Sequence, residues 1–281
     1  MVCGQQRVVA AHTRAGRKVG FRLVNPIVNL AEILETFDQE RREVEFPYGV
    51  REATDRIVRH VNRYGADSLV VFSSHPPEDL VEAVSGEISY FRGIGHDFEW
   101  KAYSHDQPKD LVERLGSMGF AVGPPEAVVV AEVDRVWGQI DDSRHEIRCL
   151  SGPEELGDYV AVRSEIWPRT EGDRQGHLAE QMRNGPESIA VYVAYIDGVA
   201  VGCSRSSFHP DSVFSGLWGG CVLPAHRRKG VYRSMIARRA KDAASRGVRY
   251  LQVDALPTSL PILERIGFQR LSVTHPCLWR F

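Results

Sequence analysis

The stretch Val222-Leu223-Pro224-Ala225-His226-Arg227-Arg228-Lys229-Gly230-Val231-Tyr232 decides the fold of this chain. It joins an apolar run, 215–223, to a segment with helical spacing, 231–246, through a short basic turn. The first N–H groups of a helix have no partner within the helix, and the helix dipole adds partial positive charge there. Because Gly230 has no Cβ, an anion can approach the backbone closely. The stretch therefore predicts a phosphate site, one that suits the diphosphate of a cofactor.

Cations beside the glycine strengthen this prediction. A helix terminus alone contributes about 0.3–1 kcal/mol to phosphate binding, or roughly 2 kcal/mol when partly buried. Arg227, Arg228 and Lys229 can add charge-assisted hydrogen bonds. Arg238 and Arg239 follow along the helix, where we expect a solvated face.

The same stretch resembles motif A of the GCN5-related N-acetyltransferase (GNAT) family, whose core reads Arg/Gln-x-x-Gly-x-Gly/Ala. After an expected strand at 250–254, the run Ser259 to Phe268 resembles the family's motif B, a short helix that ends in Gly-Phe. A hairpin signal at Asp197-Gly198 also matches the family's element order and argues against a Rossmann fold. The resemblance covers about residues 144–281 and implies an α/β (α+β) fold, with a mixed sheet flanked by helices.

The resemblance implies an N-acyltransferase that uses acetyl-CoA, or a related acyl-CoA, and transfers the acyl group by direct attack of an acceptor amine. The N–H groups of residues 228–234 would hold the diphosphate, and the strand backbone at 221–223 would pair with the pantetheine arm. The Val222 N–H would stabilise the oxyanion. A bulge at Gly219-Gly220 would open a slot toward strand 250–254 for the thioester. The expected cofactor-binding residues are Cys221, Val222, Leu223, Arg227, Arg228, Lys229, Gly230, Val231, Tyr232, Arg233, Ser234, Ser259 and Arg265.

Two positions depart from the family pattern. Tyr232 stands where the family prefers Gly or Ala, so its phenol either points off the helix or narrows the diphosphate pocket. Leu263 stands where many members carry the tyrosine that protonates the leaving thiolate. Asp254 is then the candidate catalytic group, with capping of the following turn as its structural alternative. Ser259 is expected to cap the short helix.

The first half of the chain repeats the element order of the second. Strand 68–72, helix 77–93, strand 98–103, a short helix that ends in Gly119-Phe120, and strand 127–133 follow one another. This order predicts a second, degenerate acetyltransferase-like domain at 24–136, because its first loop lacks basic residues and glycine. An unrelated α/β lobe is the alternative. A helix is expected at 29–42, and 52–63 fits either a helix or a strand.

Composition narrows the class of protein. The chain has 281 residues, and its net charge of −2 requires neither a nucleic acid nor a membrane surface as partner. Its five cysteines lie far apart without Cys-x-x-Cys spacing, which supports neither a disulfide framework nor a metal site. No run approaches the roughly 20 apolar residues of a membrane span. We therefore expect a cytoplasmic protein, either a monomer or a homodimer, and the family resemblance implies that it acts on a small-molecule or peptide amine.

Two other functions remain open from the sequence. The missing tyrosine at Leu263 is compatible with a non-catalytic module that binds or senses acyl-CoA. Residues 1–23 carry basic side chains and no acid, which fits an RNA-associated protein or, as we expect, a loosely ordered tail.

Overall fold

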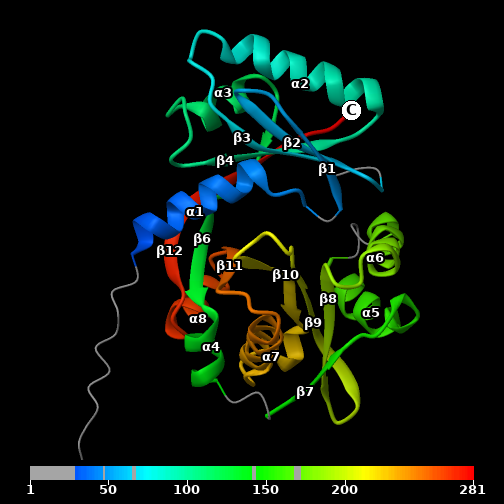
Figure 1. The fold of residues 1–281 in the computed structure, drawn as a ribbon. Helices are drawn as coiled ribbons and strands as arrows, with labels where there is room; N and C mark the ends of the chain where they lie inside the picture. Colours follow the sequence, from blue (N-terminus) through cyan, green and yellow to red (C-terminus); the bar gives the residue numbers. More distant parts are fainter. Residues whose placement is uncertain (1–28, 47, 65–67, 141–143, 168–171) are drawn as a thin grey trace, which may run out of the picture.

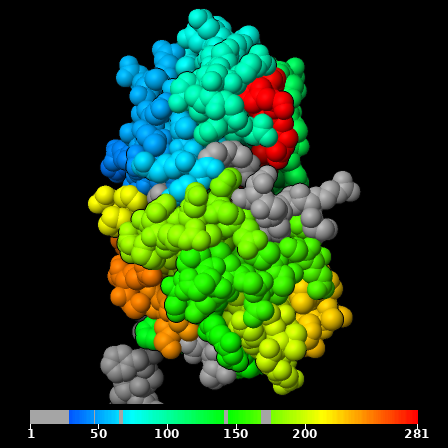
Figure 2. All heavy atoms as spheres, turned by 90° about the vertical axis from the view of Figure 1, so that its right-hand side faces the viewer, coloured from blue at the N-terminus to red at the C-terminus, as the bar shows by residue number. Residues whose placement is uncertain are grey.

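The computed structural model describes residues 29–46, 48–64, 68–140, 144–167 and 172–281, without the side chains of 172–174. The tail expected at 1–23 lies outside these residues. Within them, all strands belong to a single mixed sheet, ordered β1-β2-β3-β4-β12-β6-β11-β10-β9-β8-β7, with β5 paired to β12 (Figure 1). We call 29–140 the N-terminal half and 144–281 the C-terminal half. Figure 2 shows the two halves stacked on each other.

The strands are β1 (Gly49–Ala53), β2 (Ile57–Asn62), β3 (Ser68–Ser73), β4 (Phe98–Tyr103), β5 (Ala121–Val122), β6 (Glu126–Glu132), β7 (Glu146–Cys149), β8 (Ile189–Ile196), β9 (Val199–Ser207), β10 (Phe214–Val222), β11 (Tyr250–Ala255) and β12 (Gln269–Trp279). The helices are α1 (Leu30–Glu43), α2 (Leu80–Ile94), α3 (Leu111–Ser117), α4 (Val133–Gln139), α5 (Gly157–Ile166), α6 (Gly172–Asn184), α7 (Val231–Ser245) and α8 (Leu260–Arg265), with 3₁₀ turns at Pro153–Glu155 and Pro224–His226.

Local sequence signals explain most of these elements. Asn29 begins α1 by accepting hydrogen bonds from the N–H groups of Ala31 and Glu32. Asp197 and Gly198 both have positive φ, as the expected two-residue hairpin turn between β8 and β9 requires. The strand expected at 98–103 is β4. The segment 52–63, which the pattern left open, contributes to β1 and β2, an antiparallel pair.

The two halves contain the same structural unit. In each half, a helix connects two parallel strands: α2 joins β3 to β4, and α7 joins β10 to β11. A short helix then ends in Gly119-Phe120 or Gly267-Phe268, and a further strand follows, β6 in the first half and β12 in the second. The repeat expected from the sequence is therefore confirmed in the fold.

The last strands of the two halves are exchanged. β6, from the N-terminal half, pairs with β11 of the C-terminal half. β12, from the C-terminal half, pairs with β4 of the N-terminal half. β6 and β12 pair with each other in the middle, so the sheet crosses from one half to the other without a break. In Figure 2 the red C-terminal residues accordingly lie among the cyan and green residues of the other half.

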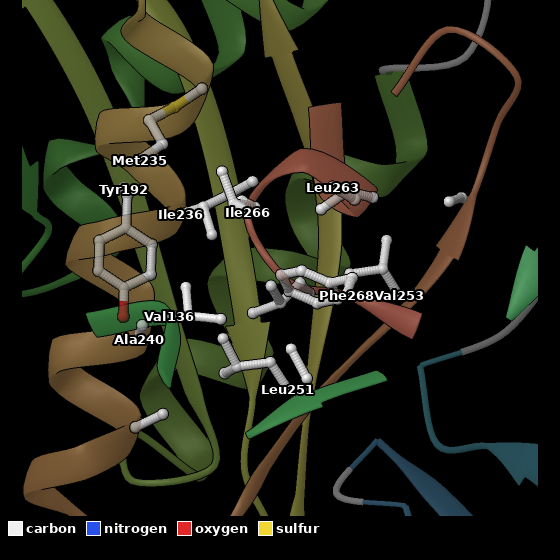
Figure 3. Packing of buried hydrophobic residues seen from close by; sticks show 14 of the residues in the cluster. Val136, Tyr192, Met235, Ile236, Ala240, Leu251, Val253, Leu263, Ile266 and Phe268 are labelled. Carbon is white, nitrogen blue, oxygen red and sulfur yellow. The ribbon is translucent and has the colours of Figure 1, made fainter. Parts of the chain in front are cut away.

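Helices cover both faces of the sheet. On one face, α4, α7 and α8 pack on the C-terminal strands through residues such as Met235, Leu251 and Leu263 (Figure 3). On the same face, α2 and α3 pack on β3 and β4 around Trp100. On the opposite face, α5 and α6 cover β8 and β9, and Ile33 of α1 packs beside Val130. No helix among the described residues is long and apolar enough to cross a lipid bilayer.

Candidate active site

A slot opens between β10 and β11. The two strands pair only where Phe214, Ser215 and Gly216 oppose 250–252, although β10 continues to Val222 and β11 to Ala255. The register of β10 on β9 shifts between Trp218 and Cys221, and Gly219 adopts a φ of +57°. This bulge turns β10 away from β11. The slot and bulge expected from the sequence are confirmed.

The backbone of Val222 faces the slot. Leu223 donates its N–H to the Val201 carbonyl of β9 at 2.8 Å, and Val222 stands opposite Gly202 in register. Because hydrogen-bonding groups alternate sides along an antiparallel strand, the Val222 N–H points away from β9. Of the expected pantetheine-binding residues, Val222 can offer its N–H to a ligand, whereas the N–H of Leu223 is already bonded within the sheet.

The turn between β10 and α7 has the backbone expected of an anion site. Gly230 adopts a φ of +92° immediately before α7, and Arg228 adopts a φ of +62°. Val231, Tyr232 and Arg233 form the first helical turn, whose N–H groups are unpaired by helix geometry. The N–H of Ser234 bonds to the Gly230 carbonyl at 3.1 Å and belongs to the helix.

Arginine and lysine side chains surround this turn. Arg228, Lys229 and Arg233 are exposed. The Arg227 Nε donates to the Val222 carbonyl at 3.1 Å, which fixes the turn to the end of β10. Sequence analysis missed Arg144, whose Nη1 lies 3.4 Å from the point that a Cβ on Gly230 would occupy. Arg144 precedes β7, far from the motif, and only the fold brings its charge to the turn.

His145 also supports the turn and was missed. Its Nδ1 lies 2.8 Å from the Ser234 Oγ, and the ring hydrogen-bonds the backbone of Lys229. Burial, together with the charge of Arg144, lowers the pKa of His145. The imidazole thus links this segment to the first helical turn of α7. Because its neutral form adds no charge there, the positive charge near the turn comes from the arginines.

Several residues lie differently from expectation. Arg239, expected on a solvated face, is 1% exposed and hydrogen-bonds Tyr232. Tyr232 turns toward the bulge, with Cε2 3.0 Å from the Cβ position of Gly220, rather than off the helix. The Ser259 hydroxyl donates to the Leu256 carbonyl and does not cap α8. Arg265 is exposed. The bulge therefore requires glycine because large side chains pack directly against it.

The buried carboxylate of Asp254 lies at the end of β11 and forms an ion pair with Lys101 of β4. Gln252 also donates to this carboxylate, at 2.6 Å. Burial alone would lower the pKa of Lys101, but the charge of Asp254 outweighs it and raises that pKa well above its ordinary value. Asp254 alternates along β11 with Val253, which faces the core under α7, so the ion pair lies on the opposite face of the sheet.

A cavity of about 360 Å³ lies on that opposite face. Its wall includes Gly216 and Trp218 at the mouth of the slot, and Lys101 and Asp254 beside them. Residues of α1, β3, β4, β9 and α6 complete the wall, so both halves of the molecule contribute to it. The cavity thus reaches β10 where its pairing with β11 ends, and the basic turn follows the far end of the same strand.

The corresponding slot of the N-terminal half is filled by side chains. β3 and β4 pair only over 68–70 and 98–100, so they also separate. Arg41 of α1 donates to the Val71 carbonyl at 3.0 Å and forms a buried ion pair with Asp106, which accepts the N–H of Tyr103 at 3.0 Å. Where β3 and β4 separate, the Val71 carbonyl and the Tyr103 N–H are thus bonded by side chains of the protein itself. This gives a physical reason why this half is degenerate.

Glu126 of β6 gives the fold a pH dependence. Burial raises its pKa to about 7, against the opposing charge of Lys101. An unfolded chain releases this proton near pH 4.3, so the folded state binds more protons between about pH 4.5 and 7 and loses stability as the pH rises. Glu126→Gln should therefore raise the melting temperature at pH 8 and change it little at pH 4.5, by circular dichroism. An equal shift at both pH values would contradict this assignment.

Comparison with known proteins agrees with this geometry. Residues 156–268 match the model of the acetyltransferase (GNAT) family. Aminoglycoside N(6')-acetyltransferases type 1 of Salmonella typhimurium and Salmonella enteritidis are each 29% identical over 126 residues, which is 41% of this chain and 85% of theirs. A GCN5-related N-acetyltransferase from Kribbella flavida aligns over 90% of this chain and 96% of its own, with 14% identity and a TM-score of 0.64. A tandem GNAT protein from the clavulanic acid biosynthesis pathway aligns over 79% of this chain and 77% of its own, with 13% identity and a TM-score of 0.52. The two structural likenesses concern the fold.

Proposed function

Because residues 156–268 form an N-acetyltransferase domain of the GNAT family, we propose that the protein transfers an acetyl group from acetyl-CoA to the amine of a small molecule held in the cavity between its halves. The observation that carries the proposal is the slot between β10 and β11, because the cavity lies at its mouth and the basic turn before α7 follows the end of β10. The two substrates would enter from opposite faces of the sheet and meet in the slot.

The residues expected to bind acetyl-CoA surround the turn. The N–H groups of Val231, Tyr232 and Arg233 would hold the diphosphate, with Arg228 and Lys229 as counter-charges. Arg144 would add a further charge beside Gly230. In the N-terminal half, Arg41 and Asp106 already bond the equivalent backbone groups, which supports one acetyl-CoA per chain.

The acetyl carbonyl would lie in the slot, next to Val222. Its N–H, which points away from β9, would stabilise the oxyanion that forms when the amine attacks. The attacking amine must be neutral, and a free primary amine with a pKa near 10.4 is mostly charged at pH 7, so it must pass a proton to water in the site. The carboxylate of Asp254, on the cavity side, would orient the amine. Leu263 is fully buried and supplies no proton donor, so solvent would protonate the thiolate.

The test is release of the CoA thiol from acetyl-CoA in the presence of a panel of primary amines. Acetylation of at least one amine, with the acetylated product identified by mass spectrometry, is the expected result. Binding of acetyl-CoA without turnover of any amine would contradict the proposal. That outcome would instead favour an acyl-CoA sensing module, which the buried Leu263 motivates.

Substitutions in the Lys101–Asp254 ion pair should change both the free energy of unfolding and the rate of turnover. Asp254→Asn or Lys101→Met leaves a buried partner without its counter-charge, which should cost about 3–5 kcal/mol of unfolding free energy for each variant. Lys101→Met combined with Asp254→Asn should cost less than the sum of the two single substitutions. Asp254→Asn should also lower turnover by about 10²-fold without weakening acetyl-CoA binding, because the cofactor site lies on the other face of the sheet.

Chemical denaturation, thiol release and calorimetric titration of acetyl-CoA measure these three quantities. Asp110→Asn is the matched control, since its exposed pair with Arg114 should contribute at most about 0.5 kcal/mol and lies outside the cavity. An unchanged rate in Asp254→Asn would remove Asp254 from the catalytic residues. Strictly additive costs would mean that the two side chains do not stabilise each other.

A further inference from the structure

The charges in the cavity wall show which chemical groups a ligand must carry. Lys101 is paired with Asp254. Arg41 is paired with Asp38 and Asp106. Glu40 accepts hydrogen bonds from the Ser212 hydroxyl and the Val213 N–H. These groups have hydrogen-bond or ion-pair partners within the chain, and Glu99, which also lines the cavity, has a partner within the chain as well.

Arg205 is different. It lies on β9 directly opposite Trp218 and forms part of the cavity wall. Within the described part of the chain, its guanidinium has neither an ion-pair nor a hydrogen-bond partner. A guanidinium presents a rigid set of donors that matches the two oxygens of a carboxylate. Arg205 thus gives the cavity a guanidinium that a carboxylate of a ligand would bind.

Tyr48 adds a neutral donor to the same wall. Burial raises its pKa to about 12, although the charges of Lys101 and Arg205 act in the opposite direction. The phenol therefore keeps its proton at neutral pH and can donate a hydrogen bond to an anion. An arginine with a nearby phenol is a combination that binds a carboxylate rather than an ammonium group.

The rest of the wall is mostly apolar. Aromatic rings contribute much of it, among them Phe37, Phe46, Phe208, Phe214 and Trp218. Such a wall favours an apolar body on the ligand, because burying apolar surface is the main source of affinity.

We propose that the acceptor is an amino acid with an apolar side chain, whose carboxylate binds Arg205 and whose amine reaches the slot beside Asp254. This inference rests on the acetyl transfer proposed above. β9 and β11 are separated by two strand spacings of about 4.8 Å, widened by the slot, and the long Arg205 side chain covers part of that width. Binding the carboxylate at β9 would direct the amine toward the acetyl carbonyl between β10 and β11.

Three probes that differ in one group test the proposal kinetically. L-Phenylalanine has the carboxylate, L-phenylalaninamide replaces it with a neutral amide, and 2-phenylethylamine lacks it. A charge-assisted hydrogen bond to the partly buried Arg205 should make kcat/KM for L-phenylalanine about 10- to 100-fold higher than for the other two. Arg205→Gln should remove this difference through KM, and Arg205→Lys should restore part of it. The rate with 2-phenylethylamine should stay within about twofold.

The controls separate failure of this inference from failure of the proposed function. Arg270→Gln changes an arginine outside the cavity and should leave all three rates unchanged. Unaltered acetyl-CoA binding would show that the Arg205 variants are folded. If the wild-type protein acetylates 2-phenylethylamine as well as L-phenylalanine, and Arg205→Gln changes neither rate, the inference is overturned while acetyl transfer stands.

A binding measurement needs no turnover. 3-Phenylpropionate has the carboxylate and the ring but no amine, so it should raise the melting temperature of the wild-type protein and not that of Arg205→Gln. If no amine is acetylated but this shift is seen, the carboxylate site stands and the transferase proposal fails. An equal shift in both proteins would overturn the role of Arg205.

Discussion

A chain that begins at residue 144 is expected not to form a stable fold, although residues 144–281 carry both acetyltransferase motifs. The reason is the exchange of β6, which lies between β11 and β12 and pairs with both. Its Val128, Val129 and Val130 are at most 2% exposed, and burial of each valine contributes about 1.5–3 kcal/mol. Removing β6 would remove the burial of these side chains and the hydrogen bonds to two neighbouring strands. The free energy lost is comparable to the 5–15 kcal/mol by which a typical domain is stable.

A second truncation isolates the cause. A chain that begins at residue 123 keeps β6 and α4 but still lacks β1–β5, so its sheet can run from β12 through β6 to β7. We expect this longer fragment to unfold cooperatively by circular dichroism and the 144–281 fragment to remain unfolded or insoluble. Equal stability of the two fragments would show that β6 is dispensable to the C-terminal half.

Gly230→Glu is expected to weaken acetyl-CoA binding by more than about 100-fold, because a charge-assisted contact of 1.5–3 kcal/mol is replaced by repulsion between two anions. The new carboxylate would lie at the N-terminus of α7, where the diphosphate is expected, and near enough to Arg144 to pair with it. Isothermal titration with acetyl-CoA measures the loss. The φ of +92° adds a backbone penalty of about 1–2 kcal/mol, which must be separated from the binding effect.

Gly247→Glu provides that separation. Gly247 adopts a φ of +73° just beyond the other end of α7, and a Cβ there would meet no atom within 4 Å. This variant carries the same charge and a similar backbone penalty, but it lies far from the turn. Its acetyl-CoA affinity should equal that of the wild type. Retained micromolar binding in Gly230→Glu would exclude the turn as the diphosphate site, and matched losses in both variants would assign the effect to folding.

The slot shows why some of the site could be predicted from sequence. This bulge needs a residue that tolerates a positive φ, and the glycine pair Gly219-Gly220 can be recognised in the sequence itself. The turn before α7 likewise follows from one glycine, a basic run and a helix start. Such features depend on neighbouring residues, whose interactions are set by their spacing along the chain. The order of elements, the hairpin turn and the repeat of the two halves were predictable for the same reason.

The partners of these elements were not predictable. Alternation along a strand tells which residues face the core, but it does not tell which strand lies alongside, so the exchange of β6 and β12 left no local signal. Lys101 and Asp254 are separated by 153 positions, and only the crossing of the sheet between the halves brings them together. Arg239 reads as a surface residue on its helix, yet the bulge and Tyr232 bury it.

The sequence by itself determined that this chain would build a strand, a basic turn and a helix able to hold a diphosphate, because backbone conformation and helix electrostatics act over a few residues. Only the tertiary structure decided what lies on the other face of the sheet: a cavity walled by both halves, with the guanidinium of Arg205 in its wall. A cavity is formed by side chains from distant segments, and its charge balance depends on which of them meet.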